Sequence, residues 1–62
     1  MQRLKIEIID QFVSQRKFAQ TTGIHESTIS NIILGVMAPS EEQRETIVKV
    51  LGISWDDLIK NI

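Results

Sequence analysis

The chain of 62 residues contains no cysteine and no tyrosine, and it has a single histidine and a single tryptophan. Without cysteine neither a disulfide nor a thiolate metal site can form, which fits a reducing compartment. No apolar run approaches the roughly 20 residues of a membrane-spanning helix, and the charged first residues differ from a secretory signal peptide. With 42% hydrophobic residues, the chain is predicted to fold as one domain over residues 1–62.

The chain also has no excess of positive charge, because it contains seven Lys and Arg residues and eight Asp and Glu residues. Proteins that bind nucleic acid gain much of their affinity by neutralising phosphates, so a net charge of −1 predicts weak nonspecific binding. The distribution is uneven. Four basic residues lie in the first 17 positions, against two acidic ones, and they are Arg3, Lys5, Arg16 and Lys17.

Groups that support catalysis or metal binding are scarce. His25 has no second histidine or cysteine with which to hold a metal ion. Glu41 and Glu42 stand where a helix begins, and there they complement the helix dipole rather than form an acid–base pair. We therefore expect no enzyme activity, no cofactor and no small-molecule ligand.

The apolar spacing and the turn residues predict five short helices and no strand. Apolar residues recur at helical intervals over about 2–12, and helices are expected over about 15–21 and 26–34. Ser40 and Gln43 form a capping box for a fourth helix that ends before Gly52, and Ser54 caps a short fifth helix. The core is predicted to contain twelve residues, namely Leu4, Ile8, Val13, Phe18, Ala19, Ile24, Ile29, Ile32, Ile47, Leu51, Ile53 and Leu58.

Residues 14–35 have the pattern of two helices joined by a tight turn. Ala19 allows close helix packing, Gly23 allows a positive φ, and Ile24 begins an apolar face that continues on the second helix. Gly35-Val-Met-Ala-Pro-Ser40 and Val50-Leu-Gly-Ile-Ser54 follow in order. Together these segments resemble the phage Cro/repressor family over roughly residues 4–59. The resemblance implies a compact, all-α, five-helix repressor-like DNA-binding domain with a central helix-turn-helix at about 15–34.

The resemblance also implies a set of DNA contacts. The expected base contacts lie on the third helix. The resemblance implies Glu26, Ser27 and Asn31, and helical geometry turns Ser30 outward beside them. The expected phosphate contacts are Gln15, Arg16, Lys17, His25 and Arg44. The alternative for the third helix is a solvated polar face. The alternatives elsewhere are ordinary helix surface for Arg16 and Lys17, and a polar turn residue for His25.

The chain departs from the family at two places. Ile8 and Ile33 stand where many members carry an Arg–Glu ion pair, and a pair replaced as a unit by packed apolar residues need not lose stability. The usually basic link after the third helix is apolar here, and beside Ile33 and Leu34 it can form an exposed patch. A weak homodimer is expected through Val36, Met37, Trp55, Ile59 and Ile62, with folding back of Val36 and Met37 onto the fourth helix as the alternative.

From these residues and the resemblance we expect a transcriptional regulator that binds double-stranded DNA. It is expected to occupy an operator as a homodimer, with repression the expected outcome although the motif itself does not separate repression from activation. The expected location is the cytoplasm of a bacterium or a phage-infected cell, in association with the nucleoid. The main alternative is a protein-interaction module of the same fold with reduced DNA affinity, resembling an antitoxin or a regulator-binding protein. A third possibility is a domain excised from a larger regulator.

Overall fold

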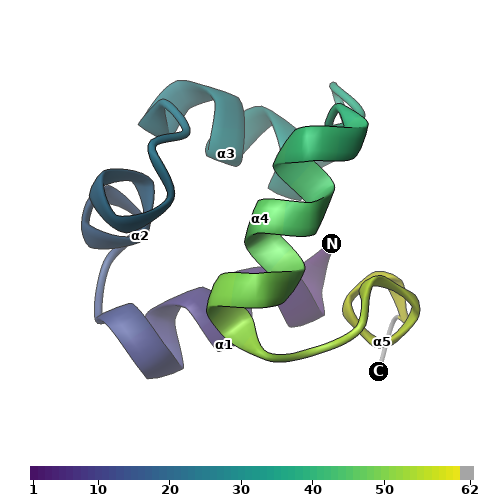
Figure 1. Cartoon of the computed structure of the whole chain (residues 1–62), viewed down its shortest axis with the longest axis horizontal. Coiled ribbons are helices and arrows are strands. Elements are labelled where there is room, and N and C mark those ends of the chain that lie inside the picture. The colour runs from purple at the N-terminus through teal and green to yellow at the C-terminus, as the bar shows by residue number, and fades with distance from the viewer. Residues whose placement is uncertain (61–62) are drawn as a thin grey trace.

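The computed structural model describes residues 1–60, and these residues form five α-helices with no strand. The helices are α1 (Gln2–Phe12), α2 (Gln15–Thr22), α3 (Glu26–Leu34), α4 (Glu41–Leu51) and α5 (Trp55–Ile59). In Figure 1, α1 lies along the lower edge, α2 and α3 lie at the left and top, and α4 crosses between α3 and α1. None of these helices is long and apolar enough to cross a membrane.

Serine side chains and glycines set most of the helix ends, as predicted. The Ser14 hydroxyl accepts a hydrogen bond from the backbone N–H of Lys17 at the start of α2. Ser40 and Gln43 form the predicted capping box of α4. Gly23 and Gly35 are the C-cap residues of α2 and α3, and their φ values of 76° and 79° lie in the left-handed region that glycine adopts without strain.

The short helix α5 is held by local polar contacts. The backbone N–H of Asp57 donates to the hydroxyl of Ser54, the N-cap residue. A side-chain hydrogen bond with Ser54, followed by a hydrogen bond and the positive charge of Lys60, lowers the pKa of the Asp57 carboxyl. The ionised form of Asp57 is therefore the one that the folded helix favours.

The core lies where α1 packs against each of the other four helices. Ten of the twelve residues predicted for the core are buried. Ile53 is half-buried and packs against the core from the α4–α5 link. The rings of Phe12 and Phe18 meet edge to face with centroids 5.2 Å apart, which joins the end of α1 to α2.

Val13 was predicted in the core, and this prediction is wrong. Its side chain is 79% exposed, and its φ of 72° lies in a region that β-branched residues rarely adopt. The backbone N–H of Val13 closes the last turn of α1 on the carbonyl of Ile9, at 3.0 Å. Only Val13 and Ser14 then remain to reverse the chain into α2, so the backbone must turn sharply at Val13.

At the end of α3, Ile33 stands where the sequence predicts a packed apolar residue in place of an ion-pair partner. It is 8% exposed and belongs to the core, as does Ile8. The carbonyl of Ile33 accepts a hydrogen bond from the α-amino group of Met1, at 2.6 Å. Leu34 and Val36 are exposed as expected, at 73% and 76%. The exposed patch therefore begins after Ile33.

Candidate nucleic-acid interface

The joint between α2 and α3 is fixed by a hydroxyl group that sequence reasoning missed. Thr22, the last residue of α2, donates from Oγ1 to the carbonyl of Phe18 at 2.9 Å. The same oxygen accepts a hydrogen bond from the backbone N–H of Ile24 at 3.2 Å. One side chain thus links the end of α2 to the turn, and Gly23 supplies the positive φ between them. A hydroxyl residue directly before a turn glycine was the available signal.

His25 begins α3 as its N-cap residue. Its Nδ1 accepts a hydrogen bond from the backbone N–H of Ser27 at 3.1 Å and lies 2.8 Å from the Ser27 hydroxyl. Because Nδ1 accepts from the backbone, the hydrogen of the neutral ring is assigned to Nε2, which is then available as a donor. His25 is exposed, so this donor is available to a partner of the helix N-terminus.

The predicted base contacts divide into two groups. Glu26, Ser27 and Asn31 are exposed on α3. Ser30 is half-buried, and its hydroxyl donates to the side-chain oxygen Oε1 of Gln15 at 2.9 Å. The structure therefore brings Ser30 together with a residue predicted to contact phosphate. This hydrogen bond joins α2 to α3 and leaves the amide nitrogen of Gln15 free to donate elsewhere.

Positive charge gathers at the start of α2. Arg16 and Lys17 are both exposed, and neither takes part in the ion pairs found within residues 1–60. Arg16 lines an open groove with Gln20 of α2 and with His25 and Glu26 at the start of α3. Gln20 is exposed and was not among the predicted contacts. It sits four residues after Arg16, the helical spacing that places two side chains on one face.

The remaining predicted residues lie elsewhere. Arg44 is exposed on α4 and lines a separate hollow with Met37 and Trp55. Trp55 is half-buried against the core, whereas Val36, Met37 and Ile59 are exposed at 76%, 38% and 48%. Ile62, the last of the predicted dimer contacts, lies outside the described residues. The structure thus separates Arg44 from the basic residues of α2.

Comparison with known protein families bears directly on this arrangement. A family model described as helix-turn-helix, of the Cro/C1 type, matches residues 13–58, which include all of α2, α3 and α4. The chain belongs to this helix-turn-helix family. The match confirms the resemblance to phage repressors and the all-helical fold. Searches of curated proteins and of solved structures gave no match.

Membership indicates the kind of function. The family consists of DNA-binding regulatory proteins, so the chain is a DNA-binding protein of the transcription-regulator kind, with double-stranded DNA as its partner. In such proteins the second helix of the motif enters the major groove. That helix is α3, which presents Glu26, Ser27 and Asn31 to solvent.

Proposed function

We propose that the chain recognises a specific operator sequence and regulates transcription by occupying it, with repression as the outcome. The observation that carries this proposal is the exposed polar face of α3, held in place by the Gln15–Ser30 hydrogen bond and the turn contacts of Thr22. Its place of action is the cytoplasm of a bacterium or phage-infected cell, on nucleoid DNA.

Asn31 is the residue best suited to read a base. Its exposed carboxamide can donate and accept at once, which matches the adenine edge in the major groove. Glu26 repels phosphates unless it accepts from a cytosine amino group, and Ser27 is short and already contacts His25. Ser30 acts through Gln15, because their hydrogen bond orients the amide that lies at the start of α2.

Phosphate contacts come from Gln15, Arg16, Lys17 and His25, which surround the starts of α2 and α3. Backbone N–H groups at a helix N-terminus favour a phosphate oxygen, and the nearby side chains add charge and donors. The set is small. We expect about three to five phosphates neutralised per subunit, each adding roughly 0.9 to the slope of log K against log salt.

Binding as a homodimer fits the exposed residues after α3. Val36 and Met37 are exposed in the link to α4, and Ile59 is exposed on α5. An isologous contact through these residues and Trp55 would set two α3 helices about 34 Å apart, the spacing of successive major grooves. Sedimentation of the wild type and Met37→Lys on a palindromic duplex tests this. A strict monomer on that duplex contradicts it.

The main experiment selects an operator from a random duplex library and compares two variants at fixed salt. Asn31→Ala should weaken operator binding by about 1–3 kcal/mol, relax the preference at one base pair and leave scrambled DNA almost unaffected. Gln15→Ala should weaken both duplexes alike, because phosphate contacts carry no sequence information. Unchanged operator affinity for Asn31→Ala would show that this face of α3 does not read bases.

A matched pair of lysines tests the phosphate contacts. Lys17 and Lys49 are both exposed and helical, but only Lys17 lies at the start of α2. Lys17→Ala should reduce the salt slope by about one, whereas Lys49→Ala should leave it nearly unchanged. Equal effects of the two substitutions on the salt slope would mean that only the net charge of the chain, and not the position of Lys17, affects DNA binding.

A second candidate function is a protein-interaction module that keeps the fold with reduced DNA affinity. The exposed apolar side chains of Leu34 and Val36, together with the net charge of −1, favour it. The library selection separates the two functions. A module of this kind would enrich no sequence, and its weak binding to DNA would be equal for operator-like and scrambled duplexes.

A further inference from the structure

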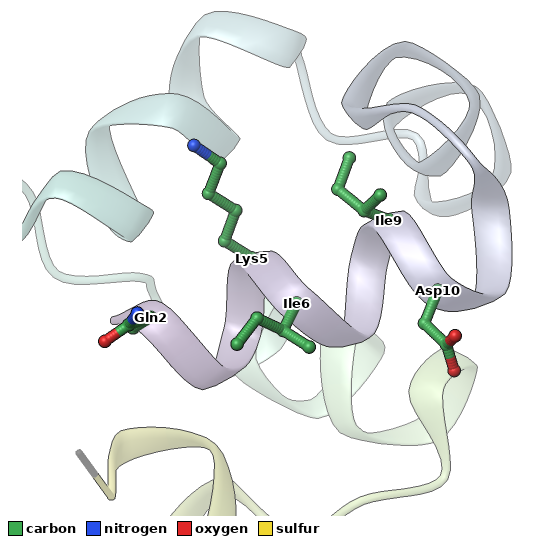
Figure 2. Close-up of a pocket in the computed structure, with 5 residues that line it drawn as sticks. All are labelled: Gln2, Lys5, Ile6, Ile9 and Asp10. Carbon is green, nitrogen blue, oxygen red and sulfur yellow. The ribbon is translucent and has the colours of Figure 1, made fainter. Parts of the chain in front are cut away.

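The outward face of α1 carries an apolar surface that neither the core nor the DNA-binding face uses. Ile6 and Ile9 are exposed at 53% and 43%. They line a shallow hollow with Gln2, Lys5 and Asp10 (Figure 2). Burial of Leu4 and Ile8 on the other side of the helix fixes this face toward solvent. Two isoleucines side by side on a solvated helix are unfavourable for an isolated chain.

Val13 is a second, independent observation at the end of the same helix. A residue at this position must adopt a φ of 72°, for which glycine is the least strained choice. The chain instead has a β-branched apolar residue that is 79% exposed and contributes almost nothing to the core. Because no contact within residues 1–60 compensates for this strain, we take the position of Val13 as a candidate for a function.

The spacing of these residues is that of a helix–helix seam. Gln2, Ile6 and Ile9 are separated by four and three residues, the a and d spacing of a heptad repeat, and Val13 follows the end of α1 four residues later. Lys5 and Asp10 then take the two flanking positions, and Figure 2 shows their side chains pointing to opposite sides of α1. The face therefore has an apolar centre, with Lys5 on one edge and Asp10 on the other. Arg3, seven residues before Asp10 and on its edge, is paired with Glu7.

The flanking charges determine which partner fits. When two copies of α1 pack in parallel, Lys5 of one copy lies on the same edge as Asp10 of the other, and both edges pair opposite charges. When the two helices are antiparallel, Lys5 meets Lys5 and Asp10 meets Asp10. The face is thus complementary to itself in the parallel orientation only.

We propose that the outward face of α1 binds the same face of a second copy of this chain, with the two helices parallel about a two-fold axis. In Figure 1, α1 and the body of α3 lie at opposite edges of the molecule. A copy that presents α3 to DNA therefore keeps α1 free. The contact is separate from the proposed dimer surface at Val36 and Met37, so it can join chains that are already bound to DNA.

The small size of the apolar centre makes this association weak in free solution. Interfaces of a few half-exposed side chains scarcely offset the entropy lost on association, so dissociation constants on the order of 1 mM are expected. Two chains held on neighbouring DNA sites have a high effective concentration, and there a weak contact becomes populated.

The experiment follows backbone NMR shifts during dilution of the DNA-free chain, with sedimentation equilibrium at high concentration. The wild type should show concentration-dependent shifts along α1. Ile6→Gln should weaken the association about tenfold or more, because two copies of the side chain leave the interface. Glu45→Gln is the control, since Glu45 is exposed on α4 and belongs neither to the α1 face nor to the proposed dimer surface. It should leave the α1 shifts unchanged.

Charge exchange tests the orientation. Lys5→Asp or Asp10→Lys alone should weaken the association severalfold, because each places like charges on both edges, and the double variant should restore it. All the exchanged side chains are exposed, and circular dichroism checks that each variant folds. The inference is overturned if α1 shows no dilution shifts at about 1 mM. Equal loss in the single and double variants also overturns it. Shifts confined to residues 34–37 and α5 would overturn it while supporting the proposed dimer surface.

Discussion

The substitution Val13→Gly should stabilise this domain, which is unusual for a change that removes an apolar side chain. Val13 has a φ of 72° and a ψ of −39°, and holding a residue other than glycine in so sparsely populated a region costs about 1–3 kcal/mol. Val13 is 79% exposed, so little buried surface is lost when the side chain is removed. Glycine loses about 0.5–1 kcal/mol more than other residues through the entropy of the unfolded chain. The net gain is about 1 kcal/mol.

In a domain of this size 1 kcal/mol raises the melting temperature by about 4–8 °C. Thermal and urea unfolding of the wild type, Val13→Gly and Val13→Ala measure the gain. Val13→Ala is the control, because it removes the same apolar methyl groups but keeps a Cβ atom at a φ of 72°. The glycine variant should be the most stable of the three. A glycine variant no more stable than the alanine variant would refute the strain argument. The glycine variant should also self-associate less, since it lacks the exposed apolar side chain that directly follows α1.

Three further outcomes follow from the core and the caps. Ile33→Glu should lower the free energy of unfolding by about 3–5 kcal/mol and unfold the domain. Adding Ile8→Arg to the same chain should recover part of this loss. If thermal unfolding shows strictly additive effects of the two substitutions, the two side chains do not contact. His25→Asp should raise stability by about 0.5–1 kcal/mol, as a better N-cap, yet weaken DNA binding; lower stability would argue against the Nδ1 cap. The folded pKa of Asp57 is lowered, so its stabilising effect is complete above about pH 4 and is lost as the pH falls through the folded pKa. Asp57→Asn should therefore flatten the acid limb of a stability–pH curve, and an unchanged curve would show no such linkage.

Local signals made most of the fold predictable from the sequence. Ser14, Ser40 and Ser54 mark helix starts, and Gly23 and Gly35 mark helix ends, through interactions within a few residues. The start of α5 could be placed in the same way.

The errors occur where such a local signal is missing. α1 ends without a glycine, so helical periodicity alone extended the apolar face to Val13 and placed an exposed residue in the core. The predicted twelve-residue core does not include Ile33, because α3 is apolar on several sides and only the packing of α1 decides which side is buried.

The candidate site divides in a similar way. The exposure of Glu26 and Asn31 follows from the inward positions of Ile29 and Ile32, which periodicity gives. The hydrogen bond between Gln15 and Ser30 joins residues 15 positions apart on two helices, and its formation depends on the crossing of those helices. The spacing of residues in the sequence does not predict how α2 and α3 cross. The base contacts themselves depend on the DNA sequence, which the chain alone does not specify.

The central place of α1 in the packing has a consequence for the timing of folding during synthesis. α1 is made first, and it packs against all four helices that are made after it. Pairs that are neighbours in sequence, such as α2 and α3, can meet early, but Leu4 and Leu58 can be buried together only after α5 has left the ribosome. The core around α1 is therefore complete only when α5, the last of these helices to be made, packs against the first.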